Sequence, residues 1–268
     1  MSNIKILYED NHIIAVVKPA GVLTQGDSSG EESLMDMVKD YIRIKKGKPL
    51  PGNACPAGNS QPAGRFPARS AGVVSSGVFL GLVHRLDKPV QGIVLFGKTS
   101  KGASRLSEQF RNHTIQKTYH AIVQGKLAEQ KGEIKEKVNK ISFFAEGFTN
   151  KSDDELLAEI KKATKTRTAE LSWEVVREGK PFDTAQGKSV YTLLKILPKT
   201  GRFHQIRIQL SNMGHSILGD KKYGYNGEWE NNNTIALAAT GISFKSATED
   251  KQIDLSIPLP EEWQKYLP

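Results

Sequence analysis

The sequence is poor in the features that mark secreted and membrane proteins. Its 268 residues include one cysteine, Cys55, so no disulfide can form within the chain, which fits a reducing compartment. No apolar run approaches the roughly 20 residues that a membrane-spanning helix requires. Met1-Ser2-Asn3 leads directly into a strand-like segment, without the charged and then apolar pattern of a signal peptide. We therefore expect a cytoplasmic protein with no membrane partner.

The patterns of two common enzyme classes are also missing. The six histidines include no pair at the spacing with which one helix binds a metal ion, which argues against metal-dependent hydrolysis. The segment His84-Arg85-Leu86-Asp87 is superficially similar to the catalytic loop of a kinase. A phosphotransferase would also need a glycine-rich phosphate loop of the kinase type and a downstream Asp-Phe-Gly motif, and neither is present.

Positive charge, in contrast, is in excess. The 38 lysines and arginines outnumber the 29 aspartates and glutamates, which gives a net charge of +9 and an isoelectric point of about 9.4. Such an excess favours a polyanionic partner, most often nucleic acid. The alternative is a protein whose charge only keeps it in solution, and charge alone does not separate the two. Hydrophobic residues make up 38% of the chain, enough for a sizeable core.

Many short strand-like segments and few helices predict an α+β fold with a mixed, mostly antiparallel sheet. No βαβ rhythm is visible. We expect strands at 4–8, 12–18, 78–83, 93–96, 116–125, 169–177, 189–197, 235–239 and 253–257, and helices at 33–45, 99–112, 151–163 and 261–266. The segment 126–139 is polar and is expected to be mostly peripheral. The segment 202–212 is interpreted as a further strand.

We expect the whole chain, 1–268, to form a single catalytic domain. The segment 47–76 is rich in proline, glycine, alanine and serine and has little periodicity, which predicts a flexible insertion. A second, shorter insertion is expected at 179–188. The predicted hairpin begins at Ile4, so we expect no further domain before it.

The most informative stretch lies between two apolar runs, 78–83 and 93–96. It contains the charged residues His84, Arg85, Asp87 and Lys88, followed by Pro89 and Gly92, which indicate a turn. A carboxylate flanked by cations is thus expected on a loop between two core strands, a common place for catalytic groups. An ordinary turn aspartate paired with its neighbours is the simpler alternative.

Three other segments share this mixture of polar residues and glycine. In Thr200-Gly201-Arg202-Phe203-His204-Gln205-Ile206-Arg207, a strand would place Gln205 and Arg207 on one face. Gln116-Lys117-Thr118-Tyr119 places an aromatic ring in a strand, which by itself is typical of a core tyrosine. The loop Gly214–Gly224 is basic and punctuated by glycines, so it could approach phosphates or simply form a turn.

Together these segments resemble the RluA family of pseudouridine synthases. The resemblance rests on His84-Arg85-Leu86-Asp87, Lys117-Thr118-Tyr119, the segment from Thr200 to Arg207, and Gly219-Asp220-Lys221-Lys222-Tyr223-Gly224, in that order along most of the chain. It implies an enzyme that converts uridine in transfer or ribosomal RNA into its C-glycoside isomer without a metal or cofactor. Larger members of this family carry an N-terminal RNA-binding S4 domain, which we do not expect here because the predicted hairpin begins at Ile4.

The resemblance also assigns roles to single residues. Asp87 would act at the glycosidic bond, either as a covalent nucleophile or by assisting loss of the base, and the two routes stay open. Arg207 would be its basic partner and lower its pKa, and Tyr119 would pack on the uracil and help remove the C5 proton. Arg85 would fill the gap left in the RNA by the displaced base. The remaining residues expected to contact the substrate are His84, Arg202, His204 and Gln205.

One alternative to an enzyme stays open from the sequence. A non-catalytic RNA-binding module could share the fold and the basic surface, but it would not need Asp87. The chain is also expected to be a monomer.

Overall fold

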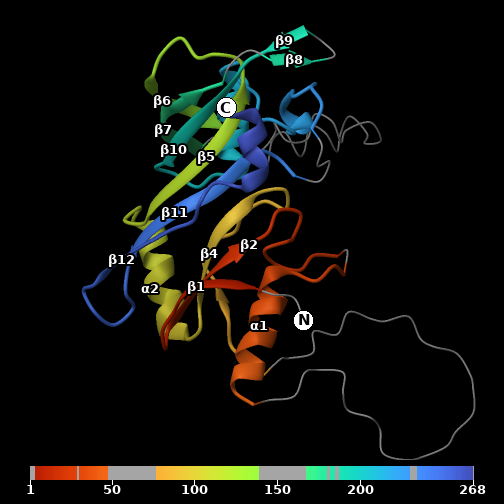
Figure 1. Ribbon diagram of the computed structural model, residues 1–268. Helices are drawn as coiled ribbons and strands as arrows, with labels where there is room; N and C mark the ends of the chain where they lie inside the picture. The colour runs from red at the N-terminus through yellow and green to blue at the C-terminus, as the bar shows by residue number, and fades with distance from the viewer. Residues whose placement is uncertain are drawn as a thin grey trace, which may run out of the picture.

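One large sheet dominates the structure. The computed structural model describes residues 4–28, 30–47, 77–138, 167–179, 182–184, 187–229 and 234–267, and within them ten strands form this sheet (Figure 1). The predicted insertion at 47–76, apart from Gly47, and the predicted helix at 151–163 lie outside the described residues.

The sheet has the order β1-β2-β4-β11-β5-β10-β7-β6, with β12 paired to β11 and β3 paired to β4. All neighbours are antiparallel except β4 and β11, which run parallel at Gln91–Gly92 and Ala238–Ala239. This arrangement confirms the predicted α+β class. The strands are β1 (Lys5–Glu9), β2 (Ile13–Lys18), β3 (Gly81–Leu82), β4 (Gln91–Gly97), β5 (Gln116–Gln124), β6 (Lys131–Val138), β7 (Arg167–Glu178), β10 (Tyr191–Pro198), β11 (Leu237–Lys245) and β12 (Gln252–Ser256).

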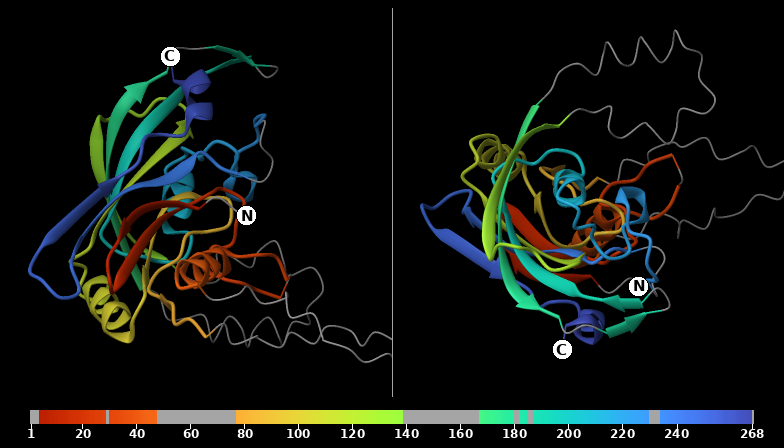
Figure 2. Two further views of the ribbon diagram at one scale, coloured as in Figure 1. Left: turned by 60° about the horizontal axis from the view of Figure 1, so that its bottom comes forward. Right: turned by 90° about the horizontal axis from the view of Figure 1, so that it is seen from above.

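Two helices cover opposite faces of the half of the sheet that contains β2 and β4 (Figure 2). Because side chains alternate along a strand, Ile14 and Val16 of β2 join the core that contains α1 (Leu34–Lys45), whereas Ile13 and Ala15 join the core that contains α2 (Ser100–Arg111). Each helix begins one residue after its predicted start, and the predicted first residue is its N-cap. Ser33 caps α1 in a capping box with Asp36, and the Thr99 hydroxyl accepts the amide hydrogen of Gly102 at the start of α2.

Two sequence-based predictions were wrong and one strand was missed. Residues 205–212 form helix α4 (Gln205–Asn212) and not a strand. The polar segment 126–139 lies at the edge of the sheet, in keeping with the expected peripheral position, but the strand β6 within it was not predicted. Of the strand predicted at 78–83, only β3 forms, although Val78 and Leu80 are buried. The predicted insertion at 179–188 contains part of a small hairpin, β8 (Phe182–Thr184) with β9 (Gly187–Ser189).

The described residues also form two short 3-10 helices, η2 (Lys221–Tyr223) and η3 (Glu261–Tyr266), the second at the position predicted for the terminal helix. None of the described helices combines the length and the apolar character needed to cross a membrane.

The junction of β4 and β11 requires a glycine, and replacing it tests the observed register. Gly92 has a φ of +139°, and a Cβ atom there would collide with the backbone oxygen of Ala239 and lie 2.6 Å from its nitrogen. We predict that Gly92→Ala lowers the free energy of unfolding by at least about 2 kcal/mol in urea denaturation, because overpacking and an unfavourable φ add. Gly26→Ala is the control, since its Cβ would meet only Asp36 Oδ2 at 3.9 Å. Equal stability of the two variants would contradict the register.

Candidate active site

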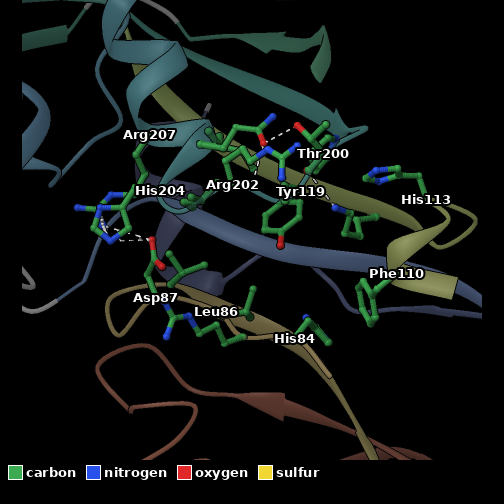
Figure 3. A pocket seen from close by; sticks show the side chains of 18 of the residues that line it. His84, Leu86, Asp87, Phe110, His113, Tyr119, Thr200, Arg202, His204 and Arg207 are labelled. Carbon is green, nitrogen blue, oxygen red and sulfur yellow. Dashed lines mark hydrogen bonds and ion pairs between the residues drawn. The ribbon is translucent and has the colours of Figure 1, made fainter. Parts of the chain in front are cut away.

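A cavity of about 490 Å³ lies where the loop before β4, the end of α2, strand β5, the loop after β10 and helix α4 meet (Figure 3). Asp87, Tyr119 and Arg207, the three predicted catalytic residues, all line it. The five residues predicted to bind substrate, Arg85, His84, Arg202, His204 and Gln205, line it as well. The fold therefore brings together every predicted site residue, although they lie as much as 123 positions apart between His84 and Arg207.

The loop that carries Asp87 is fixed on both sides of the carboxylate. The hydroxyl of Thr24 donates to the carbonyl oxygen of Leu86 at 2.7 Å and accepts the Leu86 amide hydrogen at 3.1 Å. On the other side, the fully buried ammonium of Lys18 donates to the carbonyl oxygens of Lys88, Pro19 and Val22 at 2.6–3.0 Å. Asp87 is thus held between two anchored residues, so its carboxylate has a defined position in the cavity.

Arg207 faces Asp87 from helix α4. Its Nε and Nη2 atoms each donate to the buried carboxylate of Asp220 at 2.7 Å, and its Nη1 atom lies 3.4 Å from Asp87 Oδ2. The guanidinium is therefore oriented by Asp220 in a two-pronged ion pair, and its remaining edge is turned to Asp87.

Burial has the largest effect on the ionisation of Asp87. The side chain is only 22% exposed, and burial raises its pKa above the ordinary value, against the lowering effects of Arg207, Arg85 and Lys18. Arg207 lowers the pKa of Asp87, as expected, but the effect of burial, which was not anticipated from the sequence, is larger.

His204 is the second group within reach of Asp87, with Nε2 at 3.4 Å from Oδ2. Burial, together with Arg207, Lys222 and Arg85, lowers the pKa of His204 to about 3, so the imidazole is neutral at neutral pH. Its Nδ1 atom lies 2.8 Å from the Tyr223 hydroxyl, and Arg207 Nη1 lies 3.3 Å from Nδ1 and 3.4 Å from Nε2. The neutral ring can therefore accept a hydrogen from Arg207 on one nitrogen and donate from the other.

Tyr119 and Lys117 point into the cavity from the same face of β5. Burial, and next to it the charge of Asp87, raises the pKa of Tyr119, so its phenol keeps its proton at neutral pH. Burial lowers the pKa of Lys117 to about 8, and its ammonium donates to the carbonyl oxygen of Thr200 at 3.1 Å. The ring of Tyr119 therefore presents a neutral surface beside the carboxylate.

Two of the remaining predicted residues, Gln205 and His84, use polar side-chain atoms in hydrogen bonds within the protein. Gln205 is buried: its Oε1 atom accepts from the Thr200 hydroxyl and the Arg202 amide, and its Nε2 atom donates to the Glu170 carbonyl oxygen. His84 accepts the Leu95 amide hydrogen on Nε2. Gln205 and His84 thus shape the walls of the cavity, and their contact with substrate stays a prediction.

Arg85 and Arg202 lie nearer to solvent. Arg85 is exposed, with its guanidinium 5.6 Å from the centre of the Phe203 ring. Arg202 is partly exposed, and its Nε atom donates to the Thr168 carbonyl oxygen at 3.1 Å. Both can therefore meet an anion that enters the cavity.

A comparison with known protein families identifies the family of this chain. The family model described as RNA pseudouridylate synthase matches residues 12–212, which include Asp87, Tyr119 and Arg207. The chain belongs to this family. Its members are enzymes that isomerise uridine in RNA to pseudouridine, and the predicted RluA-type membership is confirmed.

Several pseudouridine synthases are similar over almost the whole chain. The "Ribosomal large subunit pseudouridine synthase C" of Buchnera aphidicola subsp. Acyrthosiphon pisum is 30% identical over 98% of this chain and 69% of its own length. The "tRNA pseudouridine synthase C" of Haemophilus ducreyi is 28% identical over 97% of this chain and 92% of its own.

Among solved structures, "Human RNA Pseudouridylate Synthase Domain Containing 4" superposes with a TM-score of 0.65 at 18% identity, covering 98% of this chain and 91% of that one. At this identity the match shows the fold alone.

Four residues at the site of this pseudouridylate synthase were not assigned a role from sequence. Asp220 and Tyr223 lie in the glycine-punctuated loop, which carried part of the family resemblance but was assigned no residue that acts at the site. Lys18 ends a strand of apolar residues, and a lysine in such a place is itself a signal, because lysine is almost never fully buried unless it is paired. Thr24 carried no signal.

The raised pKa of Asp87 leads to a prediction about pH. A group whose pKa is higher in the folded than in the unfolded state stabilises the fold when protonated, and this stabilisation is lost as the pH rises through the folded-state pKa. We therefore predict that Asp87→Asn unfolds at higher urea concentration than the wild type at pH 7.5, and that the difference shrinks as the pH falls towards 4. Arg207 keeps its pair with Asp220 in this variant.

The control is Asp250→Asn, because the exposed carboxylate of Asp250 pairs with Lys245, which lowers its pKa. That variant should gain no stability at pH 7.5. A stability difference for Asp87→Asn that does not change with pH would contradict the assigned burial of its charge.

Proposed function

We propose that Asp87 is the group that acts at the glycosidic bond of a uridine in transfer or ribosomal RNA. The observation that carries this proposal is the position of its partly desolvated carboxylate beside the Arg207 guanidinium and in the same cavity as the Tyr119 ring. We further propose that the protein works as a single-domain monomer in the cytoplasm.

The reaction makes definite demands on these groups. The bond between N1 of the base and C1′ of the sugar breaks, the base turns, and a bond from C5 to C1′ forms. The C5 hydrogen must then leave as a proton, and N1 must gain one. Electron deficiency develops at the sugar when the base departs, so a nearby carboxylate stabilises it, by covalent attachment or by assisting loss of the base.

The neighbouring residues complete the proposed mechanism. Arg207, oriented by Asp220, keeps part of the charge on Asp87 despite burial. Tyr119 packs on the uracil, and because its pKa is raised it can act on the C5 proton only if its own proton passes to a neighbour such as Asp87. Arg85, exposed at the rim, occupies the space that the displaced uridine leaves.

The names of the relatives support an RNA substrate, but they differ in the kind of RNA. One relative is named for the ribosomal large subunit and another for tRNA. Mapping the pseudouridines of RNA from cells with and without this gene identifies the RNA and the position.

Removal of the Asp87 charge tests the proposed reaction. We predict that Asp87→Asn lowers tritium release from RNA labelled with 5-tritiated uridine by at least about 10³-fold, because the group at the reaction centre is lost. The RNA is isolated from cells lacking the gene. Asp250→Asn, an exposed aspartate outside the cavity, should release tritium like the wild type. Undiminished release by Asp87→Asn would refute the assignment.

Two substitutions separate the ring of Tyr119 from its hydroxyl. We predict that Tyr119→Phe lowers kcat by about 10²- to 10⁴-fold with little change in KM, because proton transfer is lost and stacking is kept. Tyr119→Leu should in addition raise KM about tenfold, since the stacking surface is removed. Steady-state tritium release measures both constants. Full kcat in Tyr119→Phe would exclude the hydroxyl from the reaction.

A further inference from the structure

The cavity is longer than the reaction centre. Figure 3 shows Asp87, His204 and Arg207 at one end and the rings of His84, Phe110 and His113 at the other, with Tyr119 and Arg202 between them. The far end is built by the last turn of α2 and the turn into β5, and Arg111 also lines it. None of the groups in the proposed mechanism uses this part, which we call the α2 arm: Phe110, Arg111 and His113.

Charge makes the α2 arm suitable for an anion. The cavity is lined by five cations, Arg85, Arg111, Lys117, Arg202 and Arg207, and by a single carboxylate, Asp87. Arg111 is exposed and forms no hydrogen bond or ion pair with any other described residue. Its guanidinium is therefore available for an external partner, and phosphate is the anion that an RNA strand presents at each nucleotide.

The backbone of His113 is the second observation. Its φ is +55°, and His113 and His204 are the two residues other than glycine with positive φ in the described part of the chain. Both line the cavity. His113 follows the C-cap residue of α2, a position where glycine adopts this conformation at no steric cost. A histidine there places an exposed imidazole at the end of the cavity, and backbone strain of this kind concentrates at functional sites.

Aromatic surface lies beside these groups. The ring of Phe110 is partly exposed and packs against that of His84 at a centroid distance of 4.7 Å. The ring of His84 is held in place by the Leu95 amide, and burial lowers its pKa to about 3, so it is uncharged. Uncharged rings next to a cation are the usual combination where a protein binds single-stranded nucleic acid.

We propose that the α2 arm binds a nucleotide adjacent to the target uridine, with its phosphate at Arg111 and its base against the rings of His113 and Phe110. This proposal rests on the proposed function, because it assumes an RNA strand whose target uridine lies at Asp87. It assigns the arm a part in positioning that strand, and no part in the chemical step.

Binding of fluorescein-labelled hexauridylate to the full-length Asp87→Asn protein tests the proposal without turnover. Fluorescence anisotropy between 50 and 200 mM salt gives the affinity and its salt dependence. Arg111→Ala in this background should weaken binding and reduce the slope of log K against log salt by about 0.7, the value for one phosphate contact on a single strand. Arg105→Ala is the matched control, since Arg105 is an exposed arginine of the same helix outside the cavity.

His113→Gly separates binding from a structural role. Glycine relieves the backbone strain, so the variant should be at least as stable as its parent in urea denaturation. It should nevertheless bind hexauridylate at least about fivefold more weakly, with an unchanged salt slope, because a ring contact and not an ion pair is lost. In the otherwise wild-type enzyme, His113→Gly and Arg111→Ala should raise KM for tritium release several-fold and leave kcat within about twofold.

Three results would overturn the proposal: equal affinity and salt slope for Arg111→Ala and Arg105→Ala, unchanged binding by His113→Gly, or no binding of hexauridylate by the parent protein. Failure of the proposed function is a different observation, namely no tritium release by the wild type or full release by Asp87→Asn. The proposal and the function on which it rests can therefore fail separately.

Discussion

The buried ion pair between Arg207 and Asp220 determines much of the site. A buried guanidinium is costly unless its donors are satisfied, and the two contacts of 2.7 Å to Asp220 satisfy one edge of it. The pair joins helix α4 to the turn that precedes η2, so neither element can shift alone. Only with this edge fixed does the other edge face Asp87 across 3.4 Å, a distance that leaves the carboxylate free to interact with a substrate.

Opposed effects act on the charge of Asp87, and burial is the largest of them. Burial acts against the carboxylate, whereas Arg207, Arg85 and the buried Lys18 act for it. The net rise of its pKa moves the group towards the pH at which it works, which increases its basicity without removing its charge partners. Lys18 has two roles. Its ammonium favours the charged form of Asp87, and it also binds the carbonyl oxygen of Lys88, the residue after Asp87. Loop position and charge are therefore coupled through one lysine.

Elements with one buried and one solvent-exposed face were predicted correctly, because apolar and polar residues then alternate with the period of the element. Helices α1 and α2 have apolar and polar faces, and both were predicted to within one residue at each end. Helix α4 has no such contrast, since all residues from Gln205 to Leu210 are buried. Its isoleucines and leucine alternate with Arg207 and Gln209, a period of two that is typical of a strand. Strand β6 was missed for the opposite reason: an edge strand of lysines and glutamates has too little apolar character to be distinguished from a loop.

The misassigned helix also explains why the sequence indicated the wrong neighbour for Arg207. A strand would place Gln205 beside Arg207, two positions away, although only Arg207 was assigned to Asp87 and Gln205 was assigned to the substrate. In the structure His204 lies one turn before Arg207, contacts it at 3.3 Å, and reaches Asp87 with Nε2. Gln205 turns away and holds Thr200 and Glu170. Residues 204 and 207, three positions apart, therefore lie on the side of the helix that faces the Asp87 carboxylate. Residue 205 lies on another side and supports the neighbouring loop. The residue types in this motif are compatible with a strand or a helix. The sequence alone therefore does not show which of these residues face Asp87, and the fold does.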